Sequence, residues 1–513
     1  MALVQMSLWE HVSDDAYISF RYVERCVAGQ GLTFNPGEQG EGFSNPLWIG
    51  IRALSRLLLP NFAIVDAARV LGFAASVLSF LAMAVTVKRS SPGRHSVAFL
   101  YAAVILACTP GFHVYATAGL ETPVFGMLVT AAVLFSLAET FPARLRAALC
   151  LGFAAVCRPE AALYGLLWWL FTRGPRQLRM RPGHELTVMA ALSAPFLAYE
   201  AFRITYFGEL LPNTFLAKPP GIFGGIFGIS YLLQWAIALG GPLLLVMWLL
   251  RRAPLESEVS RLLRASAGPL LAATIFVVYT RGDWMPFGRF LVPVAPLMAT
   301  CVGTLLARWT IETARERWIA RRRIVVPVAA ALGLSAIAAW NSELGAYVRN
   351  EGNNHIMRGT DQVATGQWLA EHINAGSTVA TKRLGGVSFA APDLIFWDLL
   401  GLTDREQARF VNTGKMFGGG ESPVERRFPD VMAVTDIPGS IYGYKSERGT
   451  LPWLAENYVL VKTLPQGNSG TFDIWVAKKR FDAVIRSNRS GRSDRSNRSR
   501  SFETFEPFND PER

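Results

Sequence analysis

Long apolar stretches separated by short polar loops constrain what this 513-residue chain can fold into. The stretches cover residues 64–87, 97–114, 122–138, 147–157, 161–172, 186–206, 231–250, 267–280, 289–307 and 324–340. Several fall short of the roughly 20 residues that a straight helix needs to span a bilayer. The mean hydropathy of the chain is also positive, at +0.26. We therefore predict a polytopic α-helical membrane protein, a bundle of about ten helices of which some are short or broken.

The two stretches at 147–157 and 161–172 are especially short, and the sequence Arg158-Pro159-Glu160 separates them. They predict half-helices or a broken hairpin. Irregular backbone at membrane depth is tolerated only where it lies against protein or lines a water-filled cavity. The break at Arg158 is therefore expected in such a place.

Basic residues recur in the loop after every second apolar stretch. They are Lys88, Arg89 and Arg94; Arg144 and Arg146; Arg173, Arg176, Arg179 and Arg181; Arg251, Arg252, Arg261 and Arg264; and Arg308, Arg315, Arg317, Arg321, Arg322 and Arg323. Cytoplasmic loops carry an excess of Lys and Arg, so we place these loops in the cytoplasm and both chain ends outside. Because much of the net charge of +12 lies in these clusters, we predict no nucleic-acid partner.

The composition changes after about residue 341, where short β-rich runs begin. Such runs lie at 377–381, 394–398, 431–435, 458–464 and 472–478, and they predict a soluble C-terminal α/β domain. The chain then divides into an outer loop with an acidic motif at 1–45, a transmembrane domain at 46–340, an extracytoplasmic α/β domain at 341–480 and a disordered basic tail at 481–513.

Under this topology the unusual polar residues gather on the outer side. They are Asp14, Asp15, Glu121, Arg158, Glu160, Lys218, Asp283 and Arg289. A carboxylate can take a proton from a hydroxyl group, and an adjacent like charge raises the pKa of one carboxylate. Arginine and lysine can hold a phosphate and stabilise negative charge as it leaves. The set suits transfer of a group from a lipid-bound phosphate donor to a hydroxyl acceptor, although ion pairs at helix ends and snorkelling side chains explain single members equally well.

The acidic opening "DDAYISFRY", with "GQGLTFNPGEQGEGFSNPLW" after it, resembles the first outer loop of C-type (GT-C) glycosyltransferases that use polyprenyl-phosphate sugars. Within them it is most similar to the terminal arabinofuranosyltransferase group of mycobacterial cell-wall synthesis and its bacterial relatives. The segments "GLETPVFGMLV", "CRPEAAL", "LLPNTFLAK", "GDWMPFGRFLVPVAPL" and "WDLLGLTDREQAR" match further signatures of that group in the same order. The resemblance covers the chain from about residue 14 to 440.

The resemblance implies a multi-pass glycosyltransferase of the cytoplasmic membrane with an extracytoplasmic active site. Asp14 is then the catalytic base, and Asp15 positions the acceptor or a divalent cation, Mg²⁺ or Mn²⁺. The implied residues for the donor phosphate are Arg158, Lys218 and Arg289, and those for substrate are Glu41, Asn45, Glu121, Glu160, Asn213 and Asp283. The implied partners are a polyprenyl-phosphate-linked sugar, with arabinofuranose as the sugar that this group suggests, a cell-envelope glycan acceptor and the lipid bilayer.

The sequence departs from that group in two places. No spanning helix precedes the acidic motif, and we expect the coding region upstream of Met1 to add an apolar run of roughly 20 residues. After "LGLTDREQARF" the histidine that relatives often carry is absent, and Lys415 or no residue replaces it.

Two other classes of function stay open. One is a transporter or flippase of lipid-linked or small polar substrates, because polar groups at broken helices also mark transporter sites. Against it, no inverted repeat is visible and the polar residues lie on one face rather than at the midplane. The other is a non-catalytic receptor or assembly subunit with the same fold.

Overall fold

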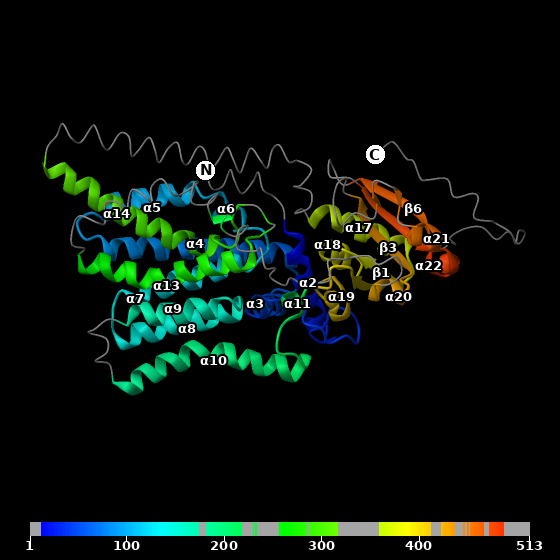
Figure 1. Cartoon of the computed structure of the whole chain (residues 1–513), viewed down its shortest axis with the longest axis horizontal. Helices are drawn as coiled ribbons and strands as arrows, with labels where there is room; N and C mark the ends of the chain where they lie inside the picture. Colours follow the sequence, from blue (N-terminus) through cyan, green and yellow to red (C-terminus); the bar gives the residue numbers. More distant parts are fainter. Residues whose placement is uncertain are drawn as a thin grey trace, which may run out of the picture. The chain divides into compact units, whose positions relative to one another are not determined.

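The chain divides into two compact units, each seen in the computed structural model (Figure 1). The structure describes residues 12–173, 181–217, 229, 231–232, 256–283, 285, 287–316, 359–411, 422–436, 445–446, 449–450, 452–465 and 471–486. The membrane unit takes its described residues from Ser44–Leu210 and Pro220–Arg349. The α/β unit takes its described residues from Val12–Phe43, Leu211–Pro219 and Asn350–Arg513.

The membrane unit is helical throughout its described residues. Its elements are α3 (Pro46–Leu58), α4 (Ile64–Ser90), α5 (His95–Ala107), α6 (Pro110–Val114), α7 (Thr122–Ser136), α8 (Phe141–Cys157), α9 (Ala161–Thr172), α10 (Pro182–Phe207), α13 (Ser257–Thr280), η2 (Val292–Val294) and α14 (Ala295–Glu316). Every predicted apolar run that the structure describes forms a helix, which confirms those predictions, and the run at 97–114 is divided between α5 and α6. The runs at 231–250 and 324–340 lie almost wholly outside the described residues.

Small residues let the helices of the membrane unit pack closely. The helix pairs in contact include α14 with α5, α13 with α9, α10 with α8 and α4 with α7. A Cβ atom on Gly303 of α14 would lie only 2.7 Å from the backbone nitrogen of Ala102 in α5. One on Gly268 of α13 would lie 2.4 Å from the nitrogen of Trp168 in α9. Such approaches of backbone to backbone are typical of helix contacts in membranes.

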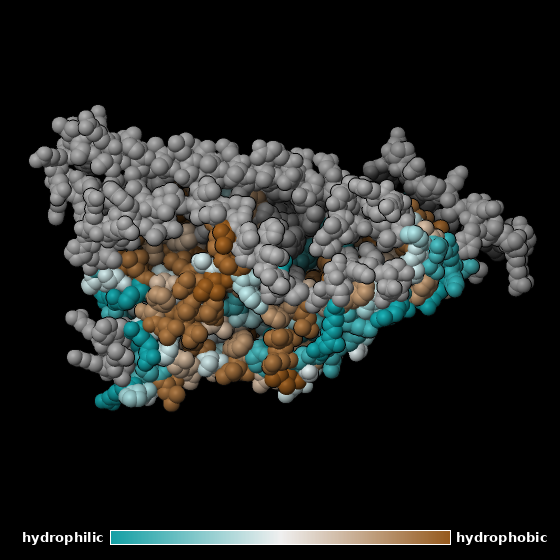
Figure 2. All heavy atoms as spheres, viewed as in Figure 1, coloured by the Kyte–Doolittle hydropathy of each residue, from teal (hydrophilic) through white to brown (hydrophobic). Residues whose placement is uncertain are grey.

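The outward faces of this unit are apolar, as lipid contact requires. Leu81 of α4, Leu100 of α5 and Leu197 of α10 are 52%, 60% and 59% exposed. On the visible part of the membrane unit apolar side chains gather, whereas hydrophilic ones gather over the α/β unit (Figure 2). Among the described helices, α4 and α13 are long and apolar enough to cross a membrane, and α5, α7, α9 and Val292–Arg308 are shorter apolar helices.

The α/β unit is built on a mixed sheet. Its elements are α2 (Asp14–Val27), α11 (Asn213–Leu216), α17 (Gly359–His372), β1 (Thr378–Thr381), α18 (Leu384–Ala390), β2 (Ile395–Asp398), α19 (Arg405–Val411), α20 (Pro423–Arg427), β3 (Val431–Asp436), β4 (Lys445–Ser446), β5 (Gly449–Thr450), α21 (Pro452–Asn457), β6 (Tyr458–Pro465), β7 (Thr471–Ala477), η3 (Lys478–Arg480) and α22 (Phe481–Val484). The five-stranded sheet has the order β2-β1-β3-β7-β6. β1 runs parallel to β2 and β3, and β7 runs antiparallel to β3 and β6.

All five predicted strands are confirmed, because each β-rich run became a strand of this sheet. A core that includes Leu399, Val424, Met432 and Tyr458 packs in this unit. The β4–β5 pair was not predicted, since each strand has only two residues. The basic tail predicted at 481–513 lies outside the described residues from 487 onward.

The acidic segment at the start of the chain is part of the α/β unit. It contains a helix, α2, which packs against α17 and α18. The buried Arg21 of α2 donates hydrogen bonds to the carbonyl oxygens of Phe34 at 3.0 Å and Leu394 at 2.9 Å, and to that of Ser388. The domain boundaries that we predicted at residues 45 and 341 separate this segment from the C-terminal α/β domain, whereas the structure places both in one unit.

Candidate functional site

The carboxylate of Asp14 is buried against the first turn of α18. Asp14 begins α2, and only 9% of it is exposed. Its Oδ1 accepts a hydrogen bond of 2.7 Å from the backbone N–H of Gly386, and its Oδ2 accepts one of 3.4 Å from that of Gly385. Burial raises the pKa of Asp14 to about 6, against the lowering effect of the Gly386 bond, and the charge of Asp15 raises it further. The partly exposed Asp15 follows on the same turn.

A carboxyl group with a pKa near 6 is well matched to general-base chemistry. It is mostly ionised at neutral pH, and it is a stronger base than an ordinary aspartate. Desolvation, the first cause of the shift, is the same physical effect that tunes acid–base residues in enzymes. The sequence predicted a raised pKa from the neighbouring charge of Asp15; the structure adds burial as the larger cause.

Asn213 and Glu41 lie together in the α/β unit. The backbone N–H of Asn213 donates to the carbonyl oxygen of Glu41 at 3.0 Å. The side-chain nitrogen of Asn213 donates to the carbonyl oxygens of Gly401 at 2.6 Å and Leu402 at 3.1 Å. Its Oδ1 atom is buried and has no hydrogen-bond partner among the described residues. A buried acceptor in that state is ready to accept a hydrogen bond from a ligand hydroxyl.

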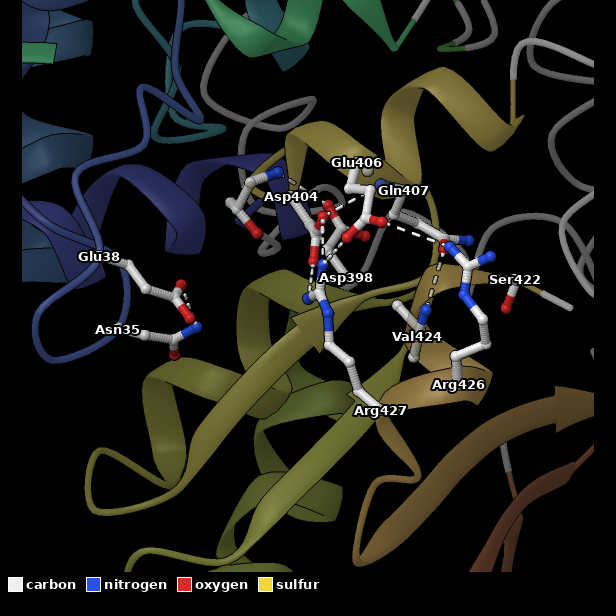
Figure 3. A network of polar contacts seen from close by, with 12 residues as sticks. Asn35, Glu38, Asp398, Asp404, Glu406, Gln407, Ser422, Val424, Arg426 and Arg427 are labelled. Carbon is white, nitrogen blue, oxygen red and sulfur yellow. Dashed lines mark hydrogen bonds and ion pairs between the residues drawn. The ribbon is translucent and has the colours of Figure 1, made fainter. Parts of the chain in front are cut away.

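Strand β2, which precedes the loop that Asn213 contacts, ends in a second buried carboxylate. Asp398 is fully buried and accepts hydrogen bonds from the backbone N–H groups of Leu400 at 2.9 Å and Thr403 at 3.1 Å. Burial raises the pKa of Asp398 to about 7. Figure 3 shows this carboxylate within the surrounding polar network, in which Arg427 pairs with Asp404. The sheet edge and the loop therefore have a fixed geometry.

Arg158 occupies the break between α8 and α9 in the membrane unit. Its Nη1 pairs with Glu121 at 2.9 Å and its Nε pairs with Glu160 at 2.7 Å. The other oxygen of Glu121 accepts a hydrogen bond of 2.8 Å from Asn45. The two short helices confirm the break predicted from the sequence.

A second buried pair lies in the same unit. Arg289 pairs with Asp283, and their side chains are 9% and 3% exposed. The guanidinium groups of Arg158 and Arg289 lie 5.7 and 5.1 Å from the ring centroid of Phe290. The charges of both arginines also reach Glu121. These contacts gather Arg158, Glu121, Glu160, Asn45, Arg289 and Asp283 into what we call the arginine cluster.

The predicted site residues thus fall into two described groups. Asp14, Asp15, Glu41 and Asn213 belong to the α/β unit, and the six residues of the arginine cluster belong to the membrane unit. Lys218 and Lys415 lie outside the described residues. Glu41 and Asn45, which share one predicted loop, belong to different units.

A metal ion finds little support in this arrangement. Among the described residues, no group of three or more His, Cys, Asp or Glu side chains is placed to hold one. Both oxygens of Asp14 already accept backbone hydrogen bonds. The described residues therefore do not by themselves make such a site for Mg²⁺ or Mn²⁺, and we derive no chemical step through either ion.

Sequence reasoning missed Gly385, Gly386, Arg21 and Asp398. The glycine pair in "KRLGGVSF" is a visible signal, because glycines admit close backbone approach. A single sequence does not reveal which residue packs against these glycines, since Asp14 lies 371 residues away from Gly385.

Comparison with solved structures shows which fold this is. ArnT from Cupriavidus metallidurans, bound to undecaprenyl phosphate, matches with a TM-score of 0.54 and 14% identity, covering 92% of this chain and 96% of that one. Its apo state matches with a TM-score of 0.55, the same identity and the same coverage. The chain has the GT-C fold. The GT-C fold confirms the predicted class and makes the protein a multi-pass membrane protein.

A curated relative confirms the resemblance drawn from the motifs. The terminal β-(1→2)-arabinofuranosyltransferase of Mycobacterium tuberculosis (strain ATCC 25618 / H37Rv) is 28% identical over 330 residues, which cover 56% of this chain and 51% of that protein. The alignment thus spans about half the length of the curated relative. A family model described as a domain of unknown function (DUF8728) matches residues 352–483, the part of the GT-C chain that contains Gly385, Gly386 and Asp398.

Proposed function

We propose that the protein is a membrane glycosyltransferase that moves a sugar from a polyprenyl-phosphate donor to a hydroxyl group of a cell-envelope glycan. The observation that carries the proposal is the buried Asp14 carboxylate, with its pKa of about 6, in a chain with the GT-C fold. The similarity to a terminal arabinofuranosyltransferase supports arabinofuranose as the sugar. The outer face of the cytoplasmic membrane is supported by the alternation of basic loops along the sequence.

The proposed chemistry is a single displacement at the sugar. Asp14 takes the proton of the acceptor hydroxyl while the hydroxyl oxygen forms a bond to the anomeric carbon. The bond between that carbon and the phosphate oxygen breaks, and its electron pair leaves with the polyprenyl phosphate. Because that phosphate is a stable anion, the step needs no general acid.

The arginine cluster is proposed to hold the donor phosphate. Two of the five N–H groups of Arg158 bind Glu121 and Glu160, and this orients the guanidinium plane while other N–H groups can reach a phosphate. Arginine suits this task because its planar fork matches phosphate geometry. Lys218 is proposed to assist. Glu41 and Asp283 are proposed to contact sugar hydroxyls, as is the Oδ1 of Asn213, which has no hydrogen-bond partner among the described residues.

The test of the base is Asp14→Asn, assayed in membranes with a polyprenyl-phosphate sugar. We expect the rate to fall by about 10²–10⁴, the scale of a positioned acid–base group. Asp482→Asn is the matched control, because Asp482 is an exposed acid in the first turn of α22 in the same unit. Turnover at the wild-type rate in Asp14→Asn would remove Asp14 from the mechanism.

The test of the phosphate site is Arg158→Lys, with Arg144→Lys as its control. Arg144 is a buried arginine of the same unit whose Nη1 pairs with Glu185, also at 2.9 Å. Both variants lose a guanidinium ion pair, but only Arg158→Lys is expected to raise the KM for the donor. An equal change of KM in the two variants, or none in either, would make Arg158 a purely structural residue.

The transporter alternative is less well supported, since the GT-C fold is shared across nearly the full length of ArnT. A divalent cation stays a prediction. Treatment with EDTA followed by addition of Mg²⁺ or Mn²⁺ tests it, because only a metal-dependent activity is lost and then recovered.

A further inference from the structure

The backbone of α18 approaches Asp14 so closely at position 385 that only a glycine fits there. A Cβ atom on Gly385 would lie 1.9 Å from the carbonyl oxygen of Asp14 and 2.6 Å from its Oδ1. Real Cβ atoms essentially never lie within 3.0 Å of a heavy atom outside their own residue and its chain neighbours. Any other residue at position 385 would therefore displace the first turn of α2.

The same glycine pair also gives Asp14 its hydrogen bonds. The N–H of Gly386 donates at 2.7 Å and that of Gly385 at 3.4 Å. The first N–H groups of a helix have no partner within the helix, so a carboxylate is a suitable acceptor for them. The close approach and the two bonds together fix both the position and the orientation of the carboxylate.

Two charged groups also act on this carboxylate. Asp15 on α2 raises its pKa, and Arg383, just before α18, lowers it. On α17, which also packs against α2, the described titratable residues Glu371 and His372 are exposed at the C-terminal end. The bond from Gly386 comes before both of these charges among the causes of the shift, so it is a main means of stabilising the charged form of Asp14.

We propose that Gly385 and Gly386 are positioning residues of the reaction: they hold the Asp14 carboxylate in the place and orientation in which it accepts the proton of the acceptor hydroxyl. This inference rests on the proposed function, since it assigns the glycines a role only if Asp14 is the base. It makes the α/β unit the part of the chain that presents the base.

The experiment compares Gly385→Ala with Gly366→Ala. Gly366 lies on α17, and a Cβ atom there would lie 2.3 Å from the carbonyl oxygen of Val387 and 2.8 Å from the Cβ of Ala390. Both substitutions therefore crowd α18, but only Gly385→Ala displaces Asp14. The readout is the pH dependence of kcat/KM between about pH 4.5 and 8.5, with thermal unfolding of each purified variant measured alongside.

We expect the acidic limb of the Gly385→Ala profile to move away from its wild-type pH by about one unit or more, because displacement of the carboxylate changes both the hydrogen bonds and the burial that set its pKa. The limb of Gly366→Ala should stay at the wild-type pH, whatever its loss of thermal stability. An unmoved limb in Gly385→Ala, or equal movement in both variants, overturns the inference.

Gly386→Pro is a second variant in case Gly385→Ala does not fold. Proline removes the N–H that donates at 2.7 Å and puts its ring Cδ in the place of that hydrogen, so the Asp14 carboxylate must shift. Proline is tolerated in the first turn of a helix. The acidic limb should again move, and an unmoved limb in a folded Gly386→Pro protein overturns the inference. Failure of the proposed function is distinguishable, because Asp14→Asn would then turn over at the wild-type rate. If Asp14→Asn is inactive and the glycine variants keep the wild-type profile, only the positioning role fails.

Discussion

Replacing Asp14 with asparagine should make the α/β unit more stable at neutral pH while it abolishes transfer. The pKa of Asp14 is raised from 3.8 to about 6 in the folded protein, first of all by burial. A group whose folded pKa is raised stabilises the fold below its unfolded pKa, and this contribution is lost as the pH rises through the folded pKa. The free energy of unfolding should therefore fall between about pH 4 and pH 6.

The size of this effect follows from the shift. One pKa unit corresponds to about 1.4 kcal/mol, so the rise from 3.8 to about 6 amounts to at most ~3 kcal/mol at pH 7. Asparagine has nearly the same shape and no charge, and its Oδ1 can still accept the hydrogen bond of Gly386. Because an asparagine nitrogen cannot accept from Gly385, we expect a net gain of about 1–2 kcal/mol at pH 7.

Hydrogen exchange of the amides in α2 and α18 measures this locally, which avoids treating a two-unit membrane protein as a two-state system. The wild type and Asp14→Asn should differ little at pH 4.5 and most above pH 6.5, with the variant exchanging more slowly. Asp482→Asn serves again as the exposed control, and its exchange should follow the wild type at every pH. Equal pH dependence in the wild type and Asp14→Asn would refute the claim that the buried carboxylate is destabilising when ionised.

Three further predictions concern the parts around this carboxylate. Arg21→Met should destabilise the α/β unit by about 2–4 kcal/mol, because the carbonyl groups of Phe34 and Leu394 lose a charged donor in a buried place. Chemical denaturation followed by tryptophan fluorescence measures this loss of stability, and a change below ~0.5 kcal/mol would contradict the prediction. Asn35→Ala should lower the free energy of unfolding by about 1–3 kcal/mol. The Asn35 side chain makes two hydrogen bonds to Phe396 on the edge strand β2, since it donates to the carbonyl oxygen and accepts from the N–H. Unchanged hydrogen exchange of the Phe396 amide would speak against this prediction. Asn213→Asp should impair transfer more than it impairs folding, because a carboxylate replaces the side-chain N–H groups that donate to the loop after β2. A KM for the acceptor equal to that of the wild type would show that Asn213 does not contact the acceptor.

Local features of the fold were predictable because they rest on local physics. Apolar length predicted the helices, β-rich runs predicted the five strands, and the shortness of two runs predicted the break at Arg158. The contacts of Asp14 with Gly385 were not predictable, since they join residues 371 positions apart. The alternation of basic loops also led us to place the segment that contains α2 in an outer loop at 1–45.

Burial of Arg21 shows why that inference about the loop was incomplete. A single sequence cannot reveal that carbonyl groups of α18 and of the segment after it will surround a guanidinium group, which allows this group to be buried at an acceptable cost. The arginine cluster was better anticipated, because ionisable residues at breaks between apolar helices are rare and need partners. The sequence suggested phosphate as that partner, and the structure adds Glu121 and Glu160.

The motif that carries the family resemblance therefore combines two physical roles. Arg21 and Asn35 both lie within the opening motif, and their side chains make hydrogen bonds within the α/β unit. Asp14 does the same through Gly385 and Gly386, yet it is the one whose ionisation is made costly by its surroundings. A purely structural carboxylate gains nothing from a raised pKa, because the same burial reduces the stability of the fold at neutral pH. The retention of a charged group in such a place is what catalysis by a general base would require, and it separates Asp14 from the anchoring residues beside it.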